Sequence, residues 1–184
     1  MNLNKNHYRY SPPYYVATLG ECKDEYFNLI KEWYLDAWGK LRVDQEPAYT
    51  VNLLNTRLSK TALPITYLVF DETSPDMPVG TFTLTHNMIG IGDPNITMFN
   101  NLYVNPDCRN KGIAKIIAKF AENIALQEFN ITCLQLGTTE LGLQQYYEKL
   151  GWHFSSQCQL GKYTVILMQK NITCAKMQSL EDNQ

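Results

Sequence analysis

The sequence predicts an α/β fold in which helices flank a central mixed sheet that is twisted and mostly antiparallel. Strand-like runs rich in β-branched and aromatic residues follow one another in hairpin order over 65–85. Apolar residues recur at helical spacing in 22–38 and again in 113–124. A strand, a turn, a long helix and another strand follow in 97–136, which is the pattern of a β-α-β unit with a right-handed crossover.

A single domain is expected over 1–170, because the 184-residue chain can bury one full core and no linker or repeat interrupts it. The domain begins with an extended segment, since Pro12 and Pro13 disfavour an early helix, and Val16–Leu19 suits a first short strand. Residues 171–184 form a polar tail that we expect to be loosely held.

Two helices and a hairpin are predicted before the β-α-β unit. The run from Cys22 to Trp38 carries aromatic and aliphatic residues at helical spacing and ends at Gly39. A shorter helix is expected over Pro47–Leu58, because proline suits a first helical turn. The hairpin strands are Ile65–Phe70, which is rich in β-branched residues, and Val79–Thr85, in which apolar and polar residues alternate.

The β-α-β unit opens with a strand over Thr97–Val104. The helix that follows, from about 111 to 128, would be roughly 27 Å long at 1.5 Å per residue. A later helix over Leu141–Leu150 ends at Gly151, which suits a left-handed C-terminal cap. Three further strands complete the predicted sheet, namely Thr132–Leu136, Trp152–Phe154 and Tyr163–Met168.

Composition and charge argue against several classes of protein. The chain is 45% hydrophobic and 18% charged, with a net charge of −2, so neither nucleic acid nor an anionic membrane is an expected partner. No apolar run approaches the roughly 20 residues that span a bilayer. The polar N-terminal region shows no signal sequence, so we expect a cytoplasmic protein. Five cysteines without a C-x-x-C pair indicate reduced thiols and no metal site.

The most informative segment runs from Leu102 to Ala114, where a strand ends and Gly112 stands at the mouth of the predicted helix. The first N–H groups of a helix have no partner within it and carry partial positive charge, so they bind anions. Arg109 and Lys111 add two cations, and a glycine allows a ligand to approach the backbone closely. The segment therefore predicts a phosphate or pyrophosphate site. An ordinary solvated turn would use the same residues, and neither G-x-G-x-x-G nor G-x-x-x-x-G-K-[ST] occurs in the chain.

Two motifs carry a resemblance to a known family. The segment Val104-Asn-Pro-Asp-Cys-Arg109-Asn-Lys-Gly112-Ile-Ala114 resembles the Arg/Gln-x-x-Gly-x-Gly/Ala signature of the GCN5-related N-acetyltransferase (GNAT) superfamily. Tyr146-Tyr147-Glu148-Lys149-Leu150-Gly151-Trp152 is similar to that family's YEKLGF segment. The motifs occur in the family's order with a strand between them. The resemblance covers about 97–154, fits the preceding hairpin and weakens over 1–60.

The resemblance implies a GNAT-type sheet and an acetyl-CoA-dependent N-acetyltransferase. The pantetheine arm of acetyl-CoA would pair like an added strand with the edge of Leu102, Tyr103 and Val104. A backbone N–H near Leu102 would polarise the thioester carbonyl. The pyrophosphate would lie on backbone N–H groups of the turn and helix start, at Arg109, Asn110, Lys111, Gly112, Ile113 and Ala114.

The resemblance also implies that Tyr147 is the general acid of the transfer. A phenol has an ordinary pKa near 10, so it is protonated at neutral pH and can donate to the departing sulfur. In the alternative interpretation, Tyr147 packs in the core while Tyr146 faces the cofactor. The spacing to Glu148-Lys149-Leu150-Gly151 favours Tyr147.

The general base is left open by the sequence. Many relatives place a carboxylate on the strand before the turn, but Met98–Asn101 offers none. A water held by backbone carbonyls or asparagine side chains, Glu140 and His86 are the candidates. Glu140 stands where many relatives have an asparagine that contacts CoA, and it would equally serve as an acid stabilised at a helix start. His86, at the end of a strand, suits a structural role better.

The acceptor is expected to be a primary amine of a small molecule. Acidic and aromatic residues of the N-terminal helices suit a cationic amine, although a solvated helix face would show the same types. These residues are Asp36, Trp38, Asp44, Glu46 and Tyr49. Two alternatives stay open, a protein or peptide acetyltransferase of effector or toxin type and a non-catalytic acyl-CoA-binding module. A homodimer is possible, and the acyl-chain preference is open.

Overall fold

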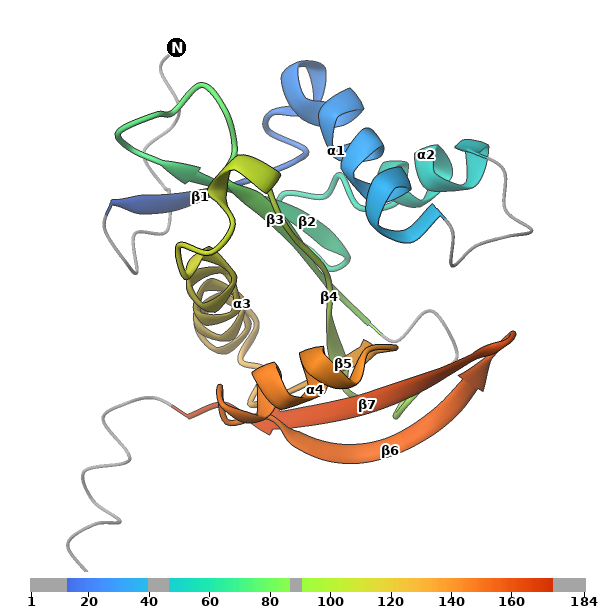
Figure 1. Cartoon of the computed structure of the whole chain (residues 1–184). Helices are drawn as coiled ribbons and strands as arrows, with labels where there is room; N and C mark the ends of the chain where they lie inside the picture. The colour runs from blue at the N-terminus through green and yellow to red at the C-terminus, as the bar shows by residue number, and fades with distance from the viewer. Residues whose placement is uncertain (1–12, 40–46, 87–90, 174–184) are drawn as a thin grey trace, which may run out of the picture. The chain divides into compact units, whose positions relative to one another are not determined.

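The computed structural model describes residues 13–39, 47–86 and 91–173 (Figure 1). These residues group into two compact units. The first unit combines Met1–Thr85 with Asn100–Phe120, and the second combines His86–Phe99 with Ala121–Gln184. One strand and one long helix each contribute to both units, so we describe the packing of each unit separately.

Seven strands form one mixed sheet in the order β1-β2-β3-β4-β5-β7-β6. The pairs β1–β2, β2–β3, β5–β7 and β6–β7 are antiparallel, and the pair β4–β5 is parallel. The predicted α/β fold with a mixed, mostly antiparallel sheet is therefore confirmed. The strands are β1 (Tyr14–Thr18), β2 (Ile65–Asp71), β3 (Gly80–Thr85), β4 (Thr97–Val104), β5 (Cys133–Thr138), β6 (His153–Leu160) and β7 (Tyr163–Asn171).

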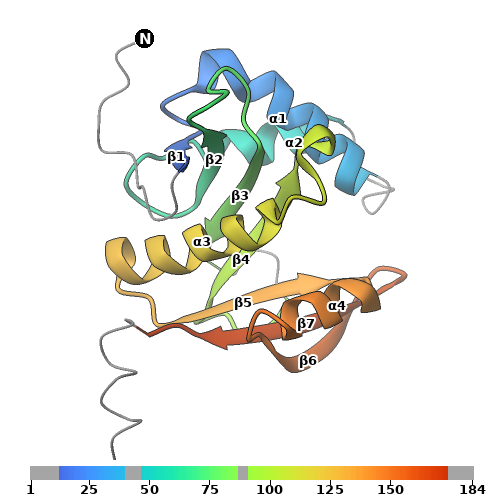
Figure 2. The same cartoon turned by 60° about the vertical axis from the view of Figure 1, so that its left-hand side comes forward.

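In the first unit, α1 (Lys23–Trp38) and α2 (Pro47–Asn55) pack against each other and lie beside β1 and β2 (Figures 1 and 2). Helix α1 turns one stripe of side chains inward, because its buried residues recur three and four positions apart. They are Tyr26, Ile30, Trp33 and Tyr34. The core joins these residues to the inner faces of β1 and β2 and to Tyr103 of β4.

In the second unit, α4 (Leu141–Glu148) contacts β5 and β6, and it lies along the β5–β7–β6 part of the sheet in Figure 2. A small apolar core forms where Met98 of β4 meets Val165 and Leu167 of β7. Trp152, at the turn between α4 and β6, is 1% exposed. This packing fixes the C-terminal end of α4.

Helix α3 (Ile113–Phe129) confirms the predicted β-α-β order, since it connects β4 to the parallel strand β5. Its start lies two residues after the predicted position, because Gly112 has a φ of +77°, outside the helical region. Most of the predicted amphipathic face is buried: Ile113, Ile117, Phe120 and Ile124 are each no more than 3% exposed, whereas Ile116 is half-buried.

The last hairpin is longer than predicted. Strand β6 covers His153–Leu160 instead of Trp152–Phe154, and β7 continues to Asn171 instead of Met168. Strand β6 stands at the edge of the sheet and is almost wholly exposed. It therefore lacks the apolar alternation by which a half-buried strand is found. Helices α2 and α4 also end before the predicted Leu58 and Leu150.

Candidate active site

The end of β4 departs from regular strand geometry at Asn101, whose φ is +53°. A left-handed residue within a strand is typical of a bulge, which disturbs the ladder of backbone hydrogen bonds. The register pairs β4 with β5 only at Thr97 and Met98. The edge of Leu102–Val104 on that side therefore has no strand partner within the described residues. Such an edge can accept an extended ligand.

The turn after β4 presents an open backbone at the mouth of α3. Asn110 and Gly112 have φ values of +62° and +77°, and a Cβ atom added to Gly112 would meet nothing within 4 Å among the described residues. Within the described part of the chain, the N–H groups of Gly112, Ile113 and Ala114 donate no backbone hydrogen bond. These groups carry the positive end of the helix dipole, so the turn can bind an anion.

Two cations are anchored beside this turn. The Nε of Arg109 donates a 3.1 Å hydrogen bond to the carbonyl of Val104, and its guanidinium carbon lies 5.2 Å from the centre of the Tyr103 ring. The Nζ of Lys111 donates a 3.0 Å hydrogen bond to the carbonyl of Asp107. Both side chains remain exposed. They add positive charge next to the free backbone N–H groups.

Tyr103 connects the end of β4 to helix α1. Its hydroxyl donates a 3.1 Å hydrogen bond to Asp36, Trp33 stacks on its ring at 5.1 Å, and Trp38 approaches the ring edge at 6.4 Å. Burial raises the pKa of Tyr103, the Asp36 carboxylate raises it further, and Arg109 opposes the shift. Two of the residues predicted for an acceptor site, Asp36 and Trp38, are thus brought to the strand predicted to hold the cofactor.

The other predicted acceptor residues are Tyr49, Asp44 and Glu46. Tyr49 lies on α2 and is 39% exposed. Asp44 and Glu46 lie outside the described residues.

Arg57 and Asn101 form a contact that no sequence motif indicates. Arg57 is 3% exposed, and its Nη1 donates a 2.6 Å hydrogen bond to the side-chain oxygen of Asn101. The guanidinium therefore holds the side chain of the residue at which β4 becomes irregular. The two residues are 44 positions apart, and no local pattern could have revealed the pair.

Tyr147 lies in the second unit and is 9% exposed, whereas Tyr146 is half-buried. The Tyr147 ring packs edge-on against Tyr146 at 5.6 Å and against Trp152 at 6.0 Å. Burial raises the pKa of Tyr147 and so keeps the phenol protonated over a wide pH range. Its hydroxyl makes no hydrogen bond within the described part of the chain, so this donor is available to a ligand.

The residues considered for the general base, or for holding a water in that role, lie in different parts of the structure. Glu140 is the exposed N-cap residue of α4, and its side chain makes no capping bond. His86 is exposed and directly follows β3. Both belong to the second unit. Asn100 lies on β4 in the first unit, and its side-chain nitrogen is buried without a partner among the described residues.

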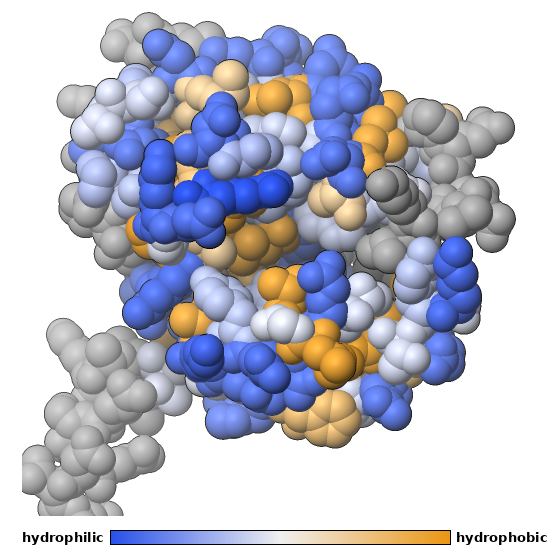
Figure 3. Space-filling model, viewed as in Figure 1, coloured by the Kyte–Doolittle hydropathy of each residue, from blue (hydrophilic) through white to orange (hydrophobic). Residues whose placement is uncertain are grey.

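Within the described residues, no helix is long and apolar enough to cross a membrane. Figure 3 shows hydrophobic side chains among hydrophilic ones where α4 lies in the same view of Figure 1, and α4 exposes Leu141 and Leu143.

All nine residues predicted to bind the cofactor lie in the first unit, and Tyr147 lies in the second.

An open strand edge at Leu102–Val104 and an open backbone turn before α3 can together bind a ligand that carries both an extended arm and a phosphate group. The model of the Acetyltransferase (GNAT) family matches residues 24–152. The chain belongs to this family and is an acetyltransferase. No curated protein matches the sequence.

Solved structures of similar fold include two N-acetyltransferases and a chain of the NatC complex. An aminoglycoside 6'-N-acetyltransferase complexed with coenzyme A has a TM-score of 0.64 at 15% identity, over 86% of this chain and 97% of the other. A mutant spermidine N-acetyltransferase from Vibrio cholerae has a TM-score of 0.62 at 15% identity, over 88% and 95%. The NatC complex bound to Gag peptide and CoA contains a chain with a TM-score of 0.62 at 18% identity, over 87% and 99%. At identities of 15–18%, these similarities show a shared fold and do not identify a substrate.

Proposed function

We propose that this protein transfers the acetyl group of acetyl-CoA to a primary amine of a small molecule, by direct attack of the amine on the thioester. The observation that carries the proposal is the open turn before α3, where Gly112 has a positive φ and the N–H groups of Gly112, Ile113 and Ala114 donate no backbone hydrogen bond to any described residue. In a GNAT domain this turn would bind the pyrophosphate of acetyl-CoA, over Arg109–Ala114. The edge of Leu102–Val104 would hold the pantetheine arm.

The chemistry requires a polarised carbonyl and a stabilised leaving group. The amine nitrogen attacks the carbonyl carbon, a C–N bond forms, and the oxygen gains negative charge. The N–H of Leu102 would stabilise this oxyanion. The C–S bond then breaks, and Tyr147 donates a hydrogen bond to the departing thiolate. Along this hydrogen bond Tyr147 passes its proton to the sulfur as the general acid, and solvent then reprotonates the phenolate.

The proton lost by the amine needs an acceptor. We propose a bound water for this role, because the buried side-chain nitrogen of Asn100 has no partner among the described residues. Buried donors of this kind are commonly satisfied by an ordered water or a ligand. Glu140 and His86 stay as alternatives, and their replacement by Gln and Ala tests them directly.

The preference for a small cationic amine is supported by the surroundings of Tyr103. The exposed carboxylate of Asp36 favours an ammonium group, and the half-buried indole of Trp38, 6.4 Å from the Tyr103 ring, is of the residue type that binds cations best. Two of the proteins with a similar fold are N-acetyltransferases of spermidine and of an aminoglycoside, which are amines of this class.

The proposal is tested by the release of CoA thiol from acetyl-CoA with a panel of polyamines, aminoglycosides, amino acids and a lysine-containing peptide. We expect turnover with at least one small polycationic amine and little with the peptide. Turnover restricted to the peptide would favour a protein acetyltransferase. Binding of acetyl-CoA without turnover on any acceptor would favour a non-catalytic module.

A further inference from the structure

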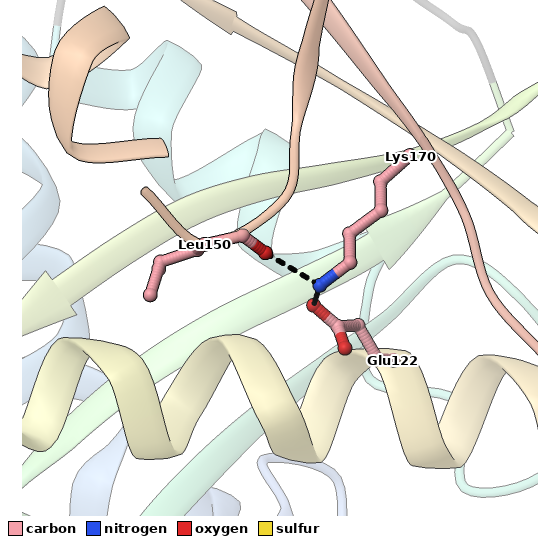
Figure 4. Close-up of polar contacts among 3 residues, drawn as sticks. All are labelled: Glu122, Leu150 and Lys170. Atoms are coloured by element: carbon pink, nitrogen blue, oxygen red, sulfur yellow. Dashed lines mark hydrogen bonds and ion pairs between the residues drawn. The ribbon is translucent and has the colours of Figure 1, made fainter. Parts of the chain in front are cut away.

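A buried ion pair in the second unit lies beside the end of α4 (Figure 4). The Nζ of Lys170 on β7 lies 2.6 Å from a carboxylate oxygen of Glu122 on α3. The side chains of Lys170 and Glu122 are only 20% and 7% exposed. The same Nζ donates a 2.7 Å hydrogen bond to the carbonyl of Leu150. One ammonium group therefore joins α3, β7 and the segment that ends α4.

The segment that receives this bond is the C-terminal cap of α4. Gly151 has a φ of +82°, its N–H donates to the Glu148 carbonyl at 3.0 Å, and the N–H of Trp152 donates to the Tyr147 carbonyl at 3.1 Å. This is the hydrogen-bond pattern of a Schellman cap, in which Tyr147 and Trp152 make the accompanying apolar contact. The position of Tyr147 thus depends on the geometry of this cap.

Lys170 donates a hydrogen bond to a backbone carbonyl that the cap of α4 leaves without a partner in the helix. The last carbonyls of a helix lack partners within it, and they carry partial negative charge that favours a nearby cation. The carbonyl of Leu150 is one of this group, and Lys170 donates to it. The Lys170 stem also covers Gly151, since a Cβ atom added there would lie 3.6 Å from the lysine Cε. Glu122 keeps the ammonium directed at this turn.

We propose that Lys170 and Glu122 are positioning residues for the acetyl transfer, because they hold the cap of α4 and through it the Tyr147 side chain. The inference rests on the role proposed above for Tyr147. A buried ion pair contributes little net stability on average, because the cost of desolvating both charges offsets their attraction. The contribution of this pair is therefore better sought in the orientation that it gives to the Leu150 carbonyl and the residues around it.

The central experiment compares Lys170→Met with the double variant Glu122→Met/Lys170→Met. The double variant replaces both charges by apolar side chains, so we expect its melting temperature to stay within a few degrees of the wild type. We expect kcat to fall about tenfold or more in both variants, with less than a twofold change in the KM for acetyl-CoA. Lys170→Arg keeps a charged donor and should recover most of the turnover. Lys149→Met removes an exposed charge from the same turn and serves as the control.

A double variant with wild-type kcat would show that the pair is only structural, and would overturn the inference. The combination of Lys170→Met with Tyr147→Phe provides the second test. If Lys170 acts through Tyr147, its loss should change kcat less than twofold in the Tyr147→Phe background. If Lys170→Met lowered kcat by the same factor in the Tyr147→Phe background as in the wild type, the inference would also be overturned. Tyr147→Phe alone with unchanged kcat would instead reject the proposed acid, so the two failures are distinguishable.

Discussion

The guanidinium of Arg57 donates a 2.6 Å hydrogen bond to the side-chain oxygen of Asn101, the one residue of β4 with a left-handed backbone. Asparagine adopts this conformation more readily than other residues with a Cβ atom, because its short polar side chain can be held by a local hydrogen bond. The next residue is Leu102, whose N–H is proposed to polarise the thioester. A buried cation therefore fixes the backbone just before the proposed oxyanion site.

Substitutions at Asn101 separate the backbone conformation from the hydrogen bond. Asn101→Gly removes the bond to Arg57 but allows positive φ, whereas Asn101→Ala removes the bond and disfavours that φ. We expect the alanine variant to lose about 1 kcal/mol more free energy of unfolding than the glycine variant, as measured by urea denaturation. Equal stabilities would show that Asn101 does not need the left-handed conformation. Both variants should lower kcat if the N–H of Leu102 is displaced.

Arg109 should act on the phosphate end of the cofactor. A methionine at this position removes the cation beside the free N–H groups, so we expect the KM for acetyl-CoA to rise about tenfold. Acetyl-pantetheine lacks the pyrophosphate, and its kinetics should be almost unchanged. Lys115→Met, which removes an exposed cation from α3, is the matched control. An equal rise in the KM for acetyl-CoA and for acetyl-pantetheine would mean that Arg109 acts instead through its contacts with Tyr103 and Val104.

The two adjacent tyrosines of α4 give opposite predictions for the two interpretations of the sequence. We expect Tyr147→Phe to lower kcat about 10- to 100-fold, with a small change in the KM for acetyl-CoA. Tyr146→Phe should change kcat less than threefold. Steady-state kinetics at saturating acceptor measures both. A large fall in kcat for Tyr146→Phe, with no fall for Tyr147→Phe, would support the alternative in which Tyr146 faces the cofactor.

Much of the fold could be predicted because the chain encodes it in local periodicity. Helix α1 shows this most clearly, since its buried residues follow one stripe from Tyr26 to Tyr34 and the helix ends just before Gly39. Strand β6 could not be delimited, because an exposed edge strand needs no apolar alternation. Its pairing with β7 is fixed by the hairpin that turns at Gly161, whose φ is +58°.

The candidate site was predictable only where residues close in sequence act together. Gly112 and the turn around it follow from a motif of a few residues, and the structure gives that glycine a positive φ. The pairs Arg57–Asn101 and Lys170–Glu122 join side chains 44 and 48 positions apart. Such pairs depend on how β4, α3 and β7 come together, and no local pattern signals them. Charged residues also look the same in sequence whether they are solvated or buried.

Cys22 should make the stability of the protein sensitive to alkaline pH. Burial raises the pKa of its thiol from 9.0 to about 11, with a further contribution from the neighbouring carboxylates of Glu21 and Glu25. The folded state therefore keeps this proton more tightly than the unfolded chain. Its contribution to the free energy of unfolding is intact below about pH 9 and is lost as the pH rises through 11. Urea titrations under reducing conditions should show a steeper decline between pH 9 and 11 for the wild type than for Cys22→Ala. Parallel curves would contradict the prediction.

Gly112 offers the most direct test of the open turn. No described atom lies within 4 Å of a Cβ added there, so the cost of Gly112→Ala comes from its φ of +77° and should be about 1 kcal/mol of unfolding free energy. The alanine would also stand beside the free N–H groups, and the KM for acetyl-CoA should rise several-fold more than that for acetyl-pantetheine. Gly142→Ala is the matched control, because Gly142 lies inside α4 with equally open surroundings, where alanine stabilises a helix by up to about 1 kcal/mol. If Gly112→Ala left the affinity for acetyl-CoA unchanged while it lowered stability, the turn would be a structural opening of α3, and the pyrophosphate would have to bind elsewhere.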